Sequence, residues 1–167
     1  MAEQAGATAW GNVNIKIGES LKEDQLATIG TLKEDSVSIE TAEGTKYELY
    51  GTGHVLVDQL VTEPTLTLKA QIIGANRDLI AKLWNTTTTG TGDTERLVVN
   101  SMVTSKKFAV QLASDVIGSD TFEAPNCAVN MSLVFSEKEG WCGDISFTIL
   151  KGDNGSFFQF GKVVVAP

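Results

Sequence analysis

The chain has 167 residues, a length that suits one domain able to bury a core without metals or disulfides. Its hydrophobic fraction of 42% is ordinary for a folded protein, and no apolar run approaches the roughly 20 residues that a membrane-spanning helix needs. The formal net charge of −8 argues against a basic surface that wraps nucleic acid, although an acidic wall past which DNA slides is compatible with it. Residues 1–10 lack the basic and apolar regions of a secretory signal, so we expect synthesis and folding in the cytoplasm.

The first predicted element is a tight hairpin with strands at residues 36–41 and 45–50. Pairing across a three-residue loop that ends in Gly44 puts Ile39 opposite Tyr47, which makes one face of the hairpin apolar. Gly44 is expected to take the left-handed backbone conformation that such loops need.

Two strands and a helix are expected to follow this hairpin. Residues 53–61 and 65–73 are strand-like, and the second run alternates apolar with polar residues. The period then changes at residues 76–84, where four apolar side chains share one helical face and Asn76 suits the N-cap. This is the one helix that the sequence predicts.

The segment 85–95 is rich in Thr and Gly and lacks apolar residues, so we expect a loop that orders against a neighbour. Residues 97–103 and 108–112 then form a second hairpin candidate, with Val99 opposite Val110. Residues 115–126 are expected to be irregular.

A third hairpin is predicted from residues 127–135 and 141–149, with Phe135 opposite Trp141. In this register Cys127 and Cys142, the two cysteines of the chain, lie on opposite faces of the hairpin and far outside disulfide geometry. We therefore expect two free thiols.

The last predicted strand covers residues 157–165 and has apolar side chains on both faces. Phe157, Phe158 and Phe160 would then be buried in a central strand of one chain, or covered by another subunit. Ten or so short strands and one helix predict a mainly β fold, with two antiparallel sheets arranged as a sandwich or partial barrel.

The sequence offers little catalytic chemistry. His54 is the only histidine, and it precedes an apolar strand, so a surface position at a strand end is the simpler interpretation. Two distant cysteines and one histidine do not make a zinc site, and the glycine pairs at residues 51–53 and 90–92 lack the context of a nucleotide-binding loop. We expect no enzyme activity, no cofactor and no metal.

The arrangement resembles the phage major tail tube protein family and the related inner-tube proteins of contractile injection systems. The similarity lies in residues 29–41, the Glu43-Gly44 turn, the strand at 45–50, and the strands at 53–61 and 65–73 that run into residues 75–84. In that family a corresponding hairpin, strand pair and single helix build two roughly orthogonal sheets flanked by the helix.

The resemblance implies a virion structural protein located in the phage tail. Subunits would form stacked hexameric rings around a lumen through which DNA passes without specific binding, and tail terminator, baseplate or sheath proteins would be further partners. Extended loops clasp neighbouring rings in that family, which would give a role to the 1–12 arm and the 85–95 loop. The residues we assign to subunit interfaces are Trp10, Asn85, Thr86, Thr87, Thr88, Thr89, Gly90, Thr91, Gly92, Phe157, Phe158 and Phe160.

Three other classes remain as alternatives. A monomeric β-sandwich that acts as a binding or adhesin-like module would use the same strands and stay monomeric. A head-decoration or tail-completion protein would also be small and β-rich. A small hydrolase would have to use His54 or the carboxylates, and His54→Ala would then abolish its activity.

Overall fold

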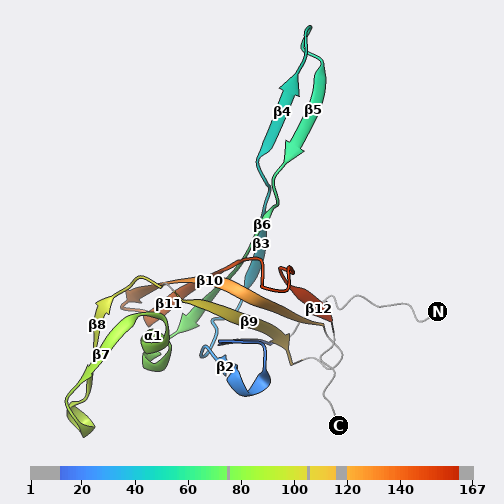
Figure 1. The fold of residues 1–167 in the computed structure, drawn as a ribbon. Helices are drawn as coiled ribbons and strands as arrows, with labels where there is room; N and C mark the ends of the chain where they lie inside the picture. The colour runs from blue at the N-terminus through green and yellow to red at the C-terminus, as the bar shows by residue number, and fades with distance from the viewer. Residues whose placement is uncertain (1–11, 75, 105, 116–119, 162–167) are drawn as a thin grey trace, which may run out of the picture.

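The computed structural model describes residues 12–74, 76–104, 106–115 and 120–161, and these residues form a mainly β, sandwich-like fold with one short α-helix (Figure 1). The predicted fold class is confirmed. The strands are β1 (Val13–Gly18), β2 (Ala27–Thr28), β3 (Ser38–Ala42), β4 (Lys46–Tyr50), β5 (Leu56–Val61), β6 (Thr65–Ile73), β7 (Asn85–Thr89), β8 (Arg96–Ser101), β9 (Lys107–Ser114), β10 (Thr121–Ser136), β11 (Gly140–Ile149) and β12 (Gln159–Gly161). The helices are α1 (Arg77–Leu83) and the 3-10 turns η1 (Glu23–Gln25) and η2 (Gly92–Thr94).

The body of the protein is an eight-stranded antiparallel sheet in which β10 belongs to two halves. The strand order is β2-β1-β9-β10-β11-β6-β3, and β12 also pairs with β10. The first part of β10 pairs with β9, the later part pairs with β11, and the register shifts between Ala124 and Cys127. Pro125 lies in this bulge, where its missing N–H costs no regular ladder hydrogen bond. β10 begins at Thr121, so residues 121–126, which are half of the region 115–126 that we predicted to be irregular, form a strand.

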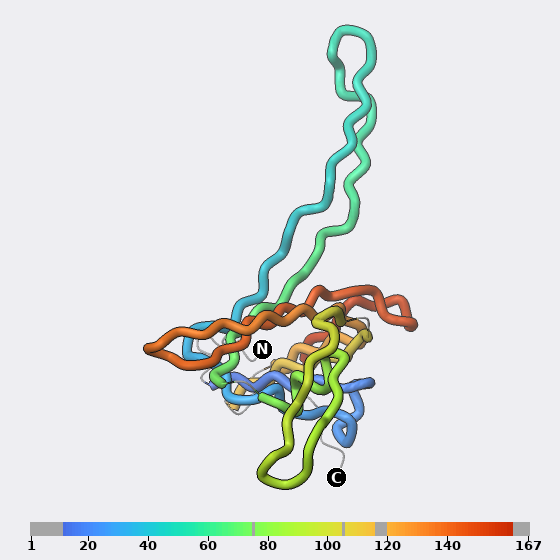
Figure 2. The backbone as a smooth tube through the Cα atoms, turned by 90° about the vertical axis from the view of Figure 1, so that its left-hand side faces the viewer, coloured from blue at the N-terminus to red at the C-terminus, as the bar shows by residue number. Residues whose placement is uncertain are grey.

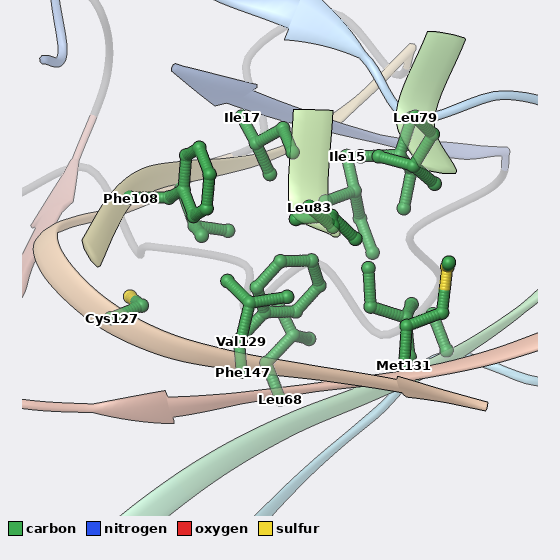
Figure 3. Packing of buried hydrophobic residues seen from close by; sticks show 14 of the residues in the cluster. Ile15, Ile17, Leu68, Leu79, Leu83, Phe108, Cys127, Val129, Met131 and Phe147 are labelled. Carbon is green, nitrogen blue, oxygen red and sulfur yellow. The ribbon is translucent and has the colours of Figure 1, made fainter. Parts of the chain in front are cut away.

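The core lies between the two halves of this sheet (Figure 3). Ile15 and Ile17 of β1 approach from one side, while Val129 of β10 and Phe147 of β11 approach from the other. Ile15 and Phe147 are fully buried. Burial of a large apolar side chain contributes roughly 1.5–3 kcal/mol, so this cluster supplies most of the drive for folding.

The helix α1 fits the prediction closely. The side chain of Asn76 accepts hydrogen bonds from the backbone N–H groups of Asp78 and Leu79, as an N-cap does. Leu79 and Leu83 are buried against the core, which explains why so short a helix is stable.

The hairpin of β10 and β11 has the register that the sequence predicts. Phe135 pairs with Trp141, and Cys127 pairs with Ile149. Both cysteines are free, as expected.

The tight hairpin predicted for residues 36–50 is wrong. β3 pairs with β6, and β4 pairs with β5, so that β3 and β4 are successive parts of the same side of one long hairpin (Figure 1). Ile39 consequently lies opposite Leu68, and Tyr47 lies opposite Leu60. The β3–β6 pairing prevails because Leu68 is a fully buried core residue, whereas the local hairpin would offer Ile39 only the exposed Tyr47.

Gly44 lets two backbones approach each other closely, and it does not form a turn. It is absent from the glycines with positive φ, and a Cβ atom built there would lie 1.7 Å from the carbonyl oxygen of Thr62. The same junction is held by hydrogen bonds from Thr62 N–H to the Thr45 carbonyl, at 3.0 Å, and from Thr45 N–H to the Thr62 hydroxyl, at 2.7 Å. The two strands therefore continue outward past residue 44 as one ribbon.

Residues 85–95 are only partly the loop that we predicted. Asn85–Thr89 is strand β7, which pairs with β8, so Val99 lies opposite Thr86 instead of Val110. The predicted hairpin of residues 97–103 and 108–112 is therefore wrong, because β9 pairs with β1 and β10. The sequence hides this strand because four consecutive threonines have high β propensity but no apolar alternation.

We predict that Gly44→Ala loosens the junction without unfolding the body. A methyl group at residue 44 would force Thr62 away and weaken the hydrogen bonds of Thr45, while the core lies elsewhere. Hydrogen exchange of the amides between residues 45 and 62 should accelerate, and the exchange of amides in β10 and β11 should not change. Glu43→Ala, at an exposed neighbouring position, is the matched control and should leave both unchanged.

Candidate assembly surfaces

The outer part of the long hairpin, β4 and β5 with their turn at residues 51–55, projects away from the body of the protein, and we call it the distal arm (Figure 2). Every residue from Ser38 to Thr65 is exposed except Gly44, which is half-buried. A two-stranded hairpin of this kind is marginally stable in water by itself. Burial of the exposed apolar side chains of the distal arm would therefore add to its stability.

One face of the distal arm is apolar. Tyr47 pairs with Leu60, and Leu49 lies two residues along the strand on the same side. These three side chains are 59%, 67% and 62% exposed, respectively. Large apolar side chains that share an exposed face are typical of protein interaction sites.

The distal arm and its ends carry an acidic excess. Glu43 and Glu63 lie at its ends, Asp58 lies opposite Leu49 on the apolar face, and Glu48 lies on the other face with Lys46. The hydroxyl of Tyr50 donates a hydrogen bond to the Glu48 carboxylate on this face. The second face is mixed, because Val61 lies opposite Lys46 and is 50% exposed.

The Thr-rich hairpin, β7 and β8 with the turn at residues 90–95, projects from the end of the body opposite to the distal arm (Figure 2). It contains the predicted interface residues Asn85 to Gly92, of which Thr86 alone is half-buried and the others are exposed. Its second strand adds Val98 and Val99, which are 40% and 41% exposed. The structure thus places the predicted segment on the surface but pairs it into a hairpin.

The later part of β10 and the strands β11, β6 and β3 form a four-stranded region with two different faces. One face lies on the core. The other face is polar, with rows of Ser, Thr, Asn and Gln and with an ion pair of 2.6 Å between Lys69 and Glu40. Asp144 accepts a hydrogen bond of 2.6 Å from the Gln71 amide beside it. The charges on this face are few and nearly balanced.

Both edges of the four-stranded region are open within the described residues. β3 ends the strand order, and β9 pairs with β10 only as far as Ala128, which leaves the same edge of residues 129–136 without a strand. An open edge exposes rows of N–H and C=O groups that can pair with another chain. The protein therefore has two complementary unpaired edges on one sheet.

The aromatic cluster near the C-terminal end is partly exposed. Phe157 is half-buried against the core, while Phe158 and Phe160 are 43% and 58% exposed and contact the ring of Phe122. The prediction that this strand is apolar on both faces is met only in part, because β12 has three residues and pairs on one edge with β10. Trp10 and the rest of residues 1–11 and 162–167 lie outside the described residues.

Sequence reasoning missed the distal arm and the two open edges. His54 lies at the tip of the distal arm with a φ of 58°, and no acid or nucleophile among its described neighbours is bonded to it. In the described ranges, no three His, Cys, Asp or Glu side chains gather in a group that would hold a metal ion. One pattern in the sequence indicates the arm, namely the two strand-like apolar runs that precede and follow Gly51-Thr52-Gly53. The same pattern is equally typical of two separate strands.

The described part of the chain contains no helix that is long and apolar enough to cross a membrane. Comparison with known proteins finds no family model that matches the chain and no curated protein with significant sequence similarity. The functional argument therefore rests on the surfaces described above.

We predict that neither thiol reacts while the protein is folded. Cys127 is completely buried, and this burial raises its pKa to about 12, so the reactive thiolate is scarce at neutral pH. Cys142 is also buried. A colorimetric thiol reagent should detect no thiol in the native protein and two per chain in denaturant; a native thiol that reacts rapidly would contradict the packing of β10 on β11.

Proposed function

We propose that the protein is a virion structural protein that self-assembles into stacked rings, which form the hollow tube of a phage tail. The sequence resemblance implies six subunits in a ring and DNA as the molecule that passes through the lumen. The observation that carries the proposal is the distal arm, a long exposed ribbon with an apolar face that the chain itself leaves uncovered.

The two open edges of the four-stranded region support closure of a ring. If β3 of one copy pairs with residues 129–136 of the next, each copy uses both edges, and the sheet continues from subunit to subunit. A contact between two different surfaces is heterologous, and it closes into a ring when the rotation between copies divides a full turn. Ring closure would cover both of these open edges.

The polar face of the four-stranded region suits the wall of a lumen. Its core-facing side must point toward each subunit's own body, so the polar side would face the axis. Its charges, Glu40, Lys69 and Asp144, give no cluster of cations that would hold phosphates. A polyanion would pass such a wall without being held.

The positions of the two hairpins support stacking along an axis. The distal arm and the Thr-rich hairpin project from opposite ends of the body, so that one end of each ring would meet the other end of the next (Figure 2). The apolar face of Tyr47, Leu49 and Leu60 would be buried in this contact. Because the two ends differ, the stack would be polar and open-ended.

The first experiment is negative-stain electron microscopy of the purified protein at high concentration, together with light scattering. The proposal predicts rings or hollow tubes and a soluble mass well above the 17.8 kDa of one chain. A strictly monomeric species that forms no assemblies, even when seeded with fragments of a tail, would favour the monomeric binding module instead.

We predict that Tyr47→Ser combined with Leu60→Ser stops tubes from elongating. The two changes remove the apolar face of the distal arm without touching the core, so the thermal unfolding of the monomer should change little. Loss of this burial should raise the concentration needed for tubes by about tenfold or more.

The matched control for this variant is Lys46→Ser combined with Gln59→Ser, which alters the opposite face of the same ribbon. Electron microscopy of the control should show tubes like those of the unmodified protein. Equal loss of tubes in both variants would mean that the ribbon as a whole, and not its apolar face, is required.

A further inference from the structure

An aromatic pair stands exposed at the end of the β10–β11 hairpin. Phe135 and Trp141 face each other across the two strands, with ring centroids 5.3 Å apart, and are 59% and 52% exposed. Strand alternation places them on the same face as the buried residues Met131 and Ile145. The pair therefore belongs to the core-facing side of the sheet, at a point where the chain's own core has ended.

The end of the hairpin is held firmly in this position. The backbone N–H of Gly74 donates a hydrogen bond of 2.8 Å to the Trp141 carbonyl, and the Lys33 ammonium donates one of 2.9 Å to the Glu139 carboxylate in the turn. A side-chain pair presented on a fixed hairpin loses little conformational freedom on binding.

A cleft of about 740 Å³ opens at the opposite edge of the same region. Val37 and Ile39, at and just before β3, line one side, while Val13, Leu112 and Phe122 line the other. Ile39 remains 39% exposed there even though its strand partner Leu68 is fully buried. The cleft thus has an apolar part beside an edge strand with one free side, and a polar part that includes Lys33, Glu34 and Asp35.

The aromatic pair and the cleft are related by the sheet that joins them. Both lie on the core-facing side, one at the β10 edge and the other at the β3 edge. The free part of the β10 edge is limited to residues 129–136, because β9 occupies the residues before them. A β3 strand from a second copy can therefore pair only next to the hairpin end that carries Phe135 and Trp141.

We propose that Phe135 and Trp141 of one copy fill the apolar cleft beside β3 of the next copy. Pairing of the two open edges would continue the sheet across the subunit boundary, and the overhanging hairpin would cover the opening in the neighbour's core. The occupant is a second copy of this chain because its aromatic pair is on the same face as the cleft and beside the open edge of β10, which can pair with the open edge of β3 that borders the cleft. The inference rests on the proposed self-assembly and names the lateral contact within it.

The contact joins two different surfaces, so it can be tested by mixing two variants that each damage one of them. Trp141→Ser removes the aromatic group but keeps the cleft, and Ile39→Glu places a charge at the cleft but keeps the aromatic pair. Each variant alone should need about tenfold or more protein to assemble, since it buries less apolar area or buries a charge. Mixed in equal amounts, with Tyr47→Ser and Leu60→Ser added to both so that the proposed axial contact is also removed, the two variants should form one intact lateral contact and stop at a mass near twice the 17.8 kDa of one chain.

The control for these variants is Val134→Ser, which lies on the other face of the same hairpin and is 45% exposed. It should assemble like the unmodified protein. Circular dichroism of each variant checks that it is folded, and sedimentation velocity measures the masses.

A second measurement follows tryptophan fluorescence during assembly, and because Trp10 is itself one of the predicted interface residues, electron microscopy first checks that the Trp10→Phe protein assembles like the unmodified protein. In a Trp10→Phe background the remaining tryptophans are Trp84, which is already buried, and Trp141. Assembly should shift the fluorescence emission to shorter wavelength because Trp141 leaves water, and the shift should vanish when Trp141→Phe is added.

The outcomes separate this contact from the proposed function. Rings or tubes that form normally with Trp141→Ser, or that form without an emission shift, would overturn the contact and leave the tube intact. A protein that forms no assembly under any condition would overturn both.

Discussion

The structure depends on β10, a 16-residue strand that the two halves of the main sheet share. Its first part pairs with β9 and its later part with β11, and the bulge after Ala124 lets the chain change partner. Because the two halves meet along this strand, their apolar faces enclose one core with Ile15 on one side and Phe147 on the other. The helix α1 packs against that core, and the two projecting hairpins extend from the body that surrounds it.

This arrangement also explains why edges remain open. β9 ends its pairing at Ala128, so β10 runs on for eight residues with one edge free. The long hairpin leaves the body through β3 and β6, which makes β3 the edge at the far side of the same region. Natural sheets usually blunt or cover such edges because they invite aggregation. An edge at each side of one region, with a polar face between them, is instead suited to controlled pairing of identical copies.

The sequence predicted those elements whose register is fixed locally. The hairpin of Cys127 to Ile149 has a short turn, and only one register aligns Met131 with Ile145 and Phe135 with Trp141, so its pairing was predicted residue by residue. The helix was predicted from its period and from Asn76. In both cases the deciding contacts lie within about 25 residues of each other.

Prediction failed where partners are distant or where two registers are equally apolar. Ile39 satisfies alternation opposite Tyr47 or opposite Leu68, and only the buried position of Leu68 in the whole fold decides between them. Val110 likewise suits Val99 by pattern, but in the fold it pairs with Ile17 and Ala124. The Thr-rich segment was correctly predicted to lie outside the core because it lacks apolar residues, while its role in an interface stays a prediction. The distal arm and the open edges were missed because they are properties of strand order, which a local pattern does not contain.

The exposed surfaces differ from one another, and this difference limits the assemblies that they can form. The distal arm, the Thr-rich hairpin, the β3 edge and the β10 edge are four different surfaces, and pairing of the β3 edge with the β10 edge would be heterologous, unlike the isologous contact of a twofold dimer. Lateral contacts between the two edges would turn each copy relative to the last, whereas contacts between the two hairpins would translate it along an axis. A subunit that used one pair of surfaces for rotation and another for translation would build a tube, which is the assembly proposed above. The same reasoning makes the lateral contact decisive, because a stack of single subunits encloses no lumen.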